Sequence, residues 1–173
     1  MNILGLCGSL RAASFNTALL HAASRLMPAQ TRLQIYTGLG DLPLFNPDLE
    51  PTAPGSVIRF RDAVAQADAL LIASPEYAHG ITGVMKNALD WLVSDERFAF
   101  KPVAVLNASP RAQHADAALR EVLRTMSARL IEPASLTVPV LGSGLDAEGM
   151  VHSPEISQRL SEALRQLLDA VRA

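Results

Sequence analysis

Apolar and amphipathic segments alternate along the whole chain. Five short runs are apolar, or alternate apolar with polar, as strands do; they cover residues 2–7, 32–36, 67–74, 102–108 and 131–138. Between them, apolar residues recur at helical spacing over 16–27, 57–66, 80–93 and 115–130. A last helix is predicted to start at Ser153-Pro154, with serine as N-cap and proline at the first helical position.

This alternation predicts a parallel sheet covered by helices on both faces. Residues 37–55 are rich in Gly, Pro and Asp and predict a long loop. In parallel sheets of this kind, ligands bind outside the carboxyl ends of the strands. The loops that follow the first, third and fourth predicted strands therefore have to be read together.

Composition narrows the class of protein. A length of 173 residues with 49% hydrophobic and 18% charged residues predicts one folded domain over 1–173 and excludes a disordered chain. The net charge of −2 gives no indication of a nucleic-acid surface. No apolar run is long enough for a membrane span, the N-terminus lacks a signal-peptide layout, and the single cysteine excludes an internal disulfide. A cytoplasmic protein without nucleic-acid or membrane partners is expected.

The loop after the first strand carries the strongest chemical signal. It contains two serines, Ser9 and Ser14, with Arg11 between them, and it leads into a helix N-terminus at Asn16. Backbone N–H groups and the helix dipole favour an anion there, and the arginine fork matches phosphate oxygens. An ordinary strand-to-helix turn with Ser14 as N-cap is the alternative. That alternative does not account for an arginine beside two serines, so we expect a phosphate site.

Three familiar phosphate loops are excluded by spacing. The loop has no lysine for a Walker A motif, and after Gly5 and Gly8 the next glycine is Gly38, which excludes the dinucleotide fingerprint. A thiol phosphatase loop would need five residues between Cys7 and its arginine, where this chain has three. Cys7 is therefore interpreted as a small buried residue at a strand end.

A second motif follows the third predicted strand. Pro75-Glu76-Tyr77 combines a rigid turn with an aromatic side chain at a strand end, and Gly83-x-x-Lys86-Asn87-Ala88-x-Asp90-Trp91 follows it. With Gly8-Ser9-Leu10-Arg11-x-x-Ser14-x-Asn16, these segments closely resemble the NAD(P)H-dependent FMN reductase family, which includes quinone, azo and chromate reductase relatives. The resemblance runs over nearly the whole chain in order and spacing.

The resemblance implies a fold, a cofactor and a set of site residues. The fold would be a flavodoxin-like three-layer sandwich with a five-stranded parallel sheet in the order 2-1-3-4-5. The cofactor would be noncovalent FMN, with NADPH or NADH as hydride donor and a quinone, azo compound, metal oxyanion or free flavin as acceptor. The residues expected around the FMN phosphate are Ser9, Arg11, Ser14, Asn16 and Thr17, and those expected along the flavin ring are Pro75, Glu76, Tyr77, Ala78 and Ser109.

The sequence departs from the family pattern at two places. Ala78 stands where the family often has asparagine, and the segment 107–113 lacks the paired glycines that many members carry. Ser109 is the one flavin contact expected from that loop, and Arg111 could contact the phosphates of the nicotinamide cofactor. Glu76 could be structural or an acid near the flavin, and a contact between His79 and the flavin stays open. The four histidines have no metal-ligand spacing, so we expect no metal.

No catalytic side chain is expected, because hydride transfer between nicotinamide and flavin is the chemistry of the cofactors themselves. Two other functions stay open: an electron carrier of the flavodoxin type, and a binding module that has lost flavin. Arg11 and the low net charge disfavour the carrier.

Assembly is the last expectation. The predicted helix 80–93 has apolar residues around much of its circumference, more than one sheet-facing stripe requires. This excess predicts a homodimer or a homotetramer, with Phe98 and Phe100 near the contact and Trp91 in the core or at the interface. The alternative is that the loop 37–55 folds over this helix within one chain.

Overall fold

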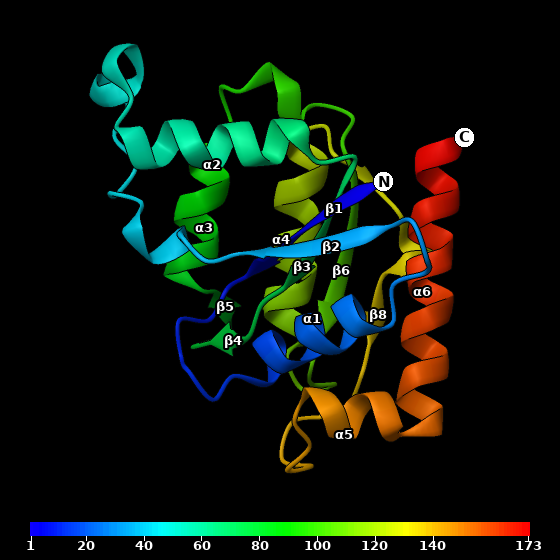
Figure 1. Cartoon of the computed structure of the whole chain (residues 1–173). Helices are drawn as coiled ribbons and strands as arrows, with labels where there is room; N and C mark the ends of the chain where they lie inside the picture. Colours follow the sequence, from blue (N-terminus) through cyan, green and yellow to red (C-terminus); the bar gives the residue numbers. More distant parts are fainter.

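The computed structural model describes all residues from 1 to 173 and places a parallel sheet between two layers of helices (Figure 1). The main strands are β1 (Asn2–Cys7), β2 (Arg32–Tyr36), β3 (Ala69–Ala73), β6 (Pro102–Asn107) and β7 (Arg129–Leu130). Their order in the sheet is β2-β1-β3-β6-β7, and β8 (Leu136–Thr137) also pairs with β6. The predicted flavodoxin-like order 2-1-3-4-5 is confirmed.

Each face of the sheet has its own hydrophobic core. Along β1, Ile3 and Cys7 belong to the core beneath α1 (Phe15–Arg25) and α6 (Pro154–Arg172), whereas Leu4 and Leu6 belong to the opposite core. That second core lies beneath α2 (Gly55–Gln66), α3 (Gly83–Asp90) and α4 (Gln113–Thr125). Alternate residues of a strand face opposite sides, so continuous apolar strands such as β1 are what a doubly covered sheet requires.

The fifth strand is broken, which corrects the continuous strand predicted over 131–138. β7 pairs with the beginning of β6 and β8 pairs with its end. Between them lies the 3₁₀ turn η4 (Glu132–Ala134), which contains Pro133. Proline has no N–H to donate to a ladder. The hydroxyl of Ser135 takes over one ladder position by accepting from the Val105 N–H at 3.0 Å.

Two predicted helices have different bounds. The helix predicted over 80–93 begins only at Gly83, because Gly80–Ile81 forms strand β5, which pairs with β4 (Glu76–Tyr77) in an antiparallel hairpin. The helix predicted over 115–130 ends at Thr125, where Ser127 takes a positive φ of 60° and turns the chain into β7. A short helix, α5 (Ala147–His152), was not predicted and precedes α6.

The segment 37–55 packs over α3 within the same chain. This is the alternative to a subunit interface that the sequence left open. It contains two 3₁₀ turns, η1 (Leu39–Asp41) and η2 (Pro47–Thr52). The Trp91 indole is fully buried, donates to the Pro43 carbonyl at 2.8 Å and meets the Phe45 ring edge to face at 5.0 Å. Phe98, in the 3₁₀ turn η3 (Glu96–Phe98), is also buried. The excess apolar surface of α3 is therefore largely covered within the chain.

No helix combines the length and the apolar composition that a membrane crossing requires. The ends of β1, β3 and β6 bring three loops together at one edge of the sheet, and the β4–β5 hairpin lies at the same edge (Figure 1).

Candidate functional site

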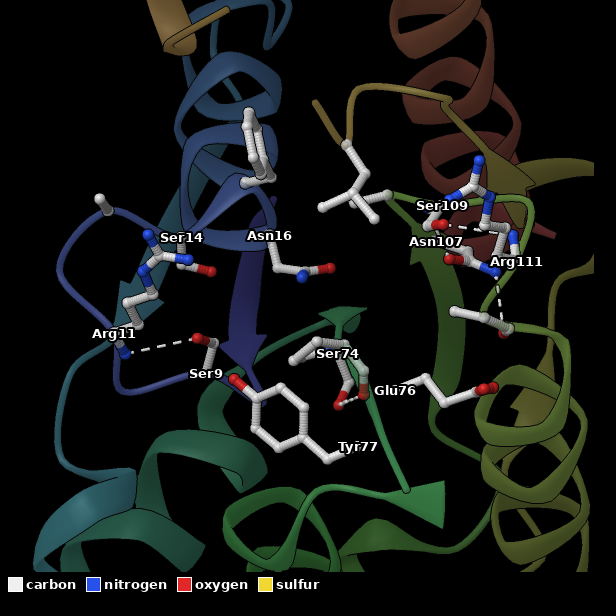
Figure 2. A pocket seen from close by; sticks show the side chains of 16 residues that line it. Ser9, Arg11, Ser14, Asn16, Ser74, Glu76, Tyr77, Asn107, Ser109 and Arg111 are labelled. Atoms are coloured by element: carbon white, nitrogen blue, oxygen red, sulfur yellow. Dashed lines mark hydrogen bonds between the residues drawn. The ribbon is translucent and has the colours of Figure 1, made fainter. Parts of the chain in front are cut away.

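A cavity of about 270 Å³ opens where these loops meet (Figure 2). One wall is the β1–α1 loop, the second is the segment after β3, and the third is the β6–α4 loop. Sixteen residues line it. This is the position at which parallel α/β sheets bind ligands.

The first wall has the properties of a phosphate site. Ser14 is the N-cap of α1, and its hydroxyl accepts from the Thr17 N–H at 3.4 Å while also facing the cavity. Ser9 accepts from the Arg11 N–H at 3.3 Å, which folds the loop so that both side chains line the cavity. Hydroxyls, a guanidinium and a helix N-terminus together form a donor set suited to a phosphate dianion.

Asn16 supplies an independent indication of a ligand. It is 6% exposed and lines the cavity, and its Oδ1 is the one buried side-chain polar atom without a hydrogen-bond partner. A buried polar atom without a partner costs about 1–3 kcal/mol. The amide can present either Oδ1 or Nδ2 to the cavity, so a bound group such as a phosphate oxygen would satisfy it.

Gly8 lies behind this wall, where the ends of β1 and β3 approach each other. A Cβ at this position would lie 2.1 Å from Ser74 Oγ and 2.7 Å from Ser74 Cβ. The Gly8 N–H donates to the Ala73 carbonyl at 2.9 Å and continues the pairing of the two strands. The glycine therefore lets the first and second walls meet closely.

The second wall is the entrance to the β4–β5 hairpin. Ala78 and His79 form its turn with φ values of 48° and 60°, as in the type I′ turns of two-residue hairpins. The Glu76 carboxylate accepts from the Ala115 N–H at 2.9 Å, in the first turn of α4. The N-cap of that helix, Ala112, has no side-chain cap of its own, so Glu76 caps the helix from another part of the chain.

The third wall is ordered by its own side chains. The Asn107 amide accepts from the Ser109 N–H at 2.9 Å and donates to the Ala112 carbonyl at 3.2 Å. The Ser109 hydroxyl accepts from the Arg111 N–H at 3.2 Å. This loop is therefore held in one conformation although it lacks the paired glycines.

The structure brings eight of the ten expected site residues to the cavity: Ser9, Arg11, Ser14, Asn16, Pro75, Glu76, Tyr77 and Ser109. Ala78 lies beyond the lining, at the tip of the hairpin. Thr17 also lies outside it, with its Oγ1 at 3.2 Å from Cys7 Sγ.

Sequence reasoning missed seven lining residues or left them unassigned: Ala13, Phe15, Ser74, Asn107, Ala108, Ala112 and Leu141. Asn107 had a usable signal, since asparagine two residues before serine at a strand end is typical of an Asx turn. Leu141 comes from the segment after β8, and no local pattern marks it.

A parallel sheet in this order, with a loop suited to phosphate binding after its first strand, defines a flavodoxin-like protein with a site for an anionic ligand. Comparison with known sequences is specific: the profile of the NADPH-dependent FMN reductase family matches residues 1–140. The chain belongs to that family. It is accordingly an NAD(P)H-dependent oxidoreductase that uses FMN, as the resemblance implied.

Individual relatives agree. An NAD(P)H-dependent FMN reductase of Pseudomonas aeruginosa is 32% identical over 180 residues, which cover 99% of this chain and 93% of the relative. A 2-hydroxy-1,4-benzoquinone reductase of a Burkholderia species is 32% identical over 166 residues, covering 92% and 90%. The solved structure of FerB, a flavoenzyme NAD(P)H:(acceptor) oxidoreductase from Paracoccus denitrificans, has a TM-score of 0.87 at 28% identity, covering 99% of this chain and 97% of FerB.

Proposed function

We propose that the protein reduces a small-molecule acceptor at the expense of NADPH or NADH, with FMN held in the cavity. The observation that carries the proposal is the pairing, at the carboxyl edge of the sheet, of a wall suited to a phosphate with the strand end Ser74–Tyr77. When bound, FMN would supply the two-electron chemistry that links the nicotinamide donor to the acceptor. The protein supplies position, orientation and exclusion of water.

The β1–α1 loop is assigned to the phosphate. Arg11 provides charge, Ser9 and Ser14 provide hydroxyls, and Asn16 provides the amide whose oxygen has no partner in the chain. Thr17 is assigned no contact with the phosphate, because its hydroxyl is directed to Cys7 and its N–H donates to Ser14 Oγ. Charge-assisted hydrogen bonds of this kind are the strong ones in phosphate binding.

The flavin ring is assigned to the opposite side of the cavity. Pro75, Glu76 and Tyr77 would lie along the ring mainly through their backbone, and Ser109 would meet it from the β6–α4 loop, whereas Ala78 lies outside the cavity lining. The hydrogen bond from the Ala115 N–H to Glu76 fixes this strand end against α4. Glu76 is thus a positioning residue, and no side chain is assigned a proton-transfer role.

Quinones are the acceptors to test first, because the Burkholderia relative is named as a benzoquinone reductase. Azo compounds, metal oxyanions and free flavin are the other acceptor classes under this proposal. Tyr77 is 58% exposed at the cavity, where an aromatic acceptor could stack on it.

The deciding experiment combines a spectrum with turnover. Purified protein should show flavin absorbance, release FMN and not FAD on denaturation, and consume NAD(P)H steadily when a quinone is present. A flavin-free preparation that cannot be reconstituted with FMN would support a binding module. A flavin-loaded protein that is not reduced by NAD(P)H would support an electron carrier.

We also propose that the chain acts as one domain in a cytoplasmic homodimer or homotetramer. Support for assembly comes from large apolar side chains that stay exposed, Leu44 at 84%, Val93 at 64% and Phe100 at 78%. Cys7 is a free, buried thiol, which fits a reducing compartment. Light scattering tests the assembly: a mass near 18.5 kDa with full activity would contradict it.

A further inference from the structure

The cavity contains a second arginine that neither the phosphate wall nor the fold accounts for. Arg111 lines the cavity from the β6–α4 loop, on the side opposite Arg11 (Figure 2). Its guanidinium forms none of the ion pairs or hydrogen bonds of the chain, although nine ion pairs occupy seven of the twelve other arginines. A guanidinium that lines a ligand cavity without a partner in the chain is free to bind an anion of the ligand.

The backbone of Arg111 is held in place before any ligand arrives. Its N–H donates to Ser109 Oγ, and the Ser109 N–H in turn donates to Asn107 Oδ1. Ser109 and Asn107 are both buried. Preorganisation of this kind lowers the ordering cost that an exposed arginine pays when it binds an anion.

Other groups on this side cannot take the same role. The N-terminal turn of α4 points toward this wall, but the carboxylate of Glu76 already accepts the Ala115 N–H. Glu76 is also the one acidic residue in the cavity lining. Arg111 is therefore the free positive charge of the third wall.

A single FMN phosphate does not need both arginines. Arg11 lies with Ser9, Ser14 and Asn16 around one anion site, whereas Arg111 lies across the cavity from them (Figure 2). An anion bound by Arg111 would then belong to the molecule that occupies the cavity together with the cofactor. In the proposed reaction, the dinucleotide donor is the molecule that always carries phosphates.

We infer that Arg111 binds a phosphate group of the nicotinamide dinucleotide and selects that donor over uncharged dihydronicotinamides. This inference rests on the proposed function. The phosphate could come from the diphosphate, which NADH and NADPH share, or from the 2′-phosphate of NADPH. Either source gives the guanidinium a bidentate partner.

The test is steady-state kinetics of FMN-loaded Arg111→Gln with three donors: NADPH, NADH and N-benzyl-1,4-dihydronicotinamide, which has no phosphate. We expect the KM for the dinucleotide to rise roughly ten- to a hundred-fold, as loss of a charged hydrogen-bond pair predicts. The KM for the benzyl donor should change far less. A rise for NADPH alone assigns the 2′-phosphate, and a rise for both dinucleotides assigns the diphosphate.

A binding measurement without turnover supports the kinetics. Calorimetry with 1,4,5,6-tetrahydro-NADP, which cannot give hydride, should show the same loss of affinity in Arg111→Gln and a smaller loss in Arg111→Lys. Arg25→Gln is the matched control. The substitution removes the same charge, but Arg25 lies in the last turn of α1, away from the cavity.

Three results would overturn the inference: unchanged KM for both dinucleotides, an equal rise for all three donors, or release of FMN from Arg111→Gln. The last result would make Arg111 a cofactor contact. Failure of the wild-type protein to bind FMN or oxidise any donor would instead contradict the proposed function, before the variant is compared.

Discussion

The segment 37–55 and the loops around the cavity are both irregular, but they differ in how their polar side chains are paired. The polar groups of the segment 37–55 have partners within the chain, whereas several at the cavity have none. In the first, Glu50 accepts from Arg61 at 2.9 Å and from Ser94 at 2.8 Å, and the Asn87 amide binds main-chain groups of Pro43 and Phe45. Around the cavity, Arg11 and Arg111 have no carboxylate partner and Asn16 Oδ1 has none at all.

The difference shows where the chain stabilises itself and where it keeps its groups for a ligand. Paired groups in the segment 37–55 hold it over Trp91, so changes there should affect folding. At the cavity, the unpaired Arg11 and Arg111 side chains contribute little to folding and the unpaired Asn16 Oδ1 destabilises the fold, so changes there should affect binding. Positive φ at Ala78 and His79 adds backbone strain beside the cavity, and no residue of the segment 37–55 has a positive φ.

The largest effect is expected from Trp91→Ala. The indole is fully buried, stacks edge to face with Phe45 and donates to Pro43, so its removal leaves a cavity beneath the segment 37–55. We expect the free energy of unfolding without FMN to fall by about 3–5 kcal/mol. Chemical denaturation measures this. Trp91→Phe, which keeps an aromatic ring, should cost less, and a loss of FMN affinity comparable with the loss of stability would break the distinction between the two regions.

The next largest effect is expected on FMN binding and not on stability. Arg11→Ala should weaken FMN binding by about 1.5–3 kcal/mol, because a charge-assisted contact to phosphate is lost. Its unfolding free energy without FMN should stay within about 0.5 kcal/mol of the wild-type value, since the side chain has no partner in the chain. Fluorescence titration of the FMN-free protein gives the dissociation constant. An unchanged constant would show that Arg11 does not reach the phosphate.

Gly8→Ala should affect both properties, because Gly8 joins the cavity to the sheet. The Ser74 hydroxyl can rotate away from a new methyl group, but Ser74 Cβ at 2.7 Å can move only with the end of β3. We expect a loss of about 1–3 kcal/mol in unfolding free energy, as for other overpacked sites, together with weaker FMN binding. Gly83→Ala is the control, because no atom lies within 4 Å of its added Cβ. Equal effects of both substitutions would contradict this account.

The same division separates what the sequence could predict from what it could not. Strands β1, β3 and β6 are continuous apolar runs, and the rule that parallel sheets bind ligands at their carboxyl edge predicted that the loops after them meet. The family resemblance supplied Pro75 and Ser109 within those loops, and the structure brings both to the cavity. The β4–β5 hairpin escaped prediction because Ala78-His79 is not a typical type I′ pair. Contacts between the hairpin and α4 hold it there, and such contacts have no local signature.

The orientation of individual side chains was the second feature that the sequence could not predict. Thr17 follows Asn16 by one residue, and one step around a helix turns a side chain by about 100°, so the two face different surroundings. The structure directs the Thr17 hydroxyl to Cys7 and Asn16 to the cavity. The break at Pro133 had only a weak signal: proline cannot donate to a ladder, but this strand lies at the edge of the sheet, where proline is tolerated.

The smallest effect is expected from Glu50→Gln, and it depends on pH. Burial raises the pKa of the Glu50 carboxyl, but hydrogen bonds from Arg61 and Ser94 outweigh burial and hold the pKa below its usual range. A carboxyl with a depressed pKa in the folded state stabilises the fold above its unfolded pKa of about 4.3 and loses that contribution as the pH falls. The wild-type protein should therefore lose more stability than Glu50→Gln between about pH 6 and pH 3, by less than about 1 kcal/mol for a partly exposed pair. Thermal unfolding across this range measures the difference. Glu121→Gln is the control, because Glu121 is exposed and belongs to none of the ion pairs of α4. Glu50 lies outside the cavity, so the Glu50→Gln variant should have the same FMN dissociation constant at pH 7 as the wild-type protein. A larger dissociation constant would show that the segment 37–55 also shapes the binding site.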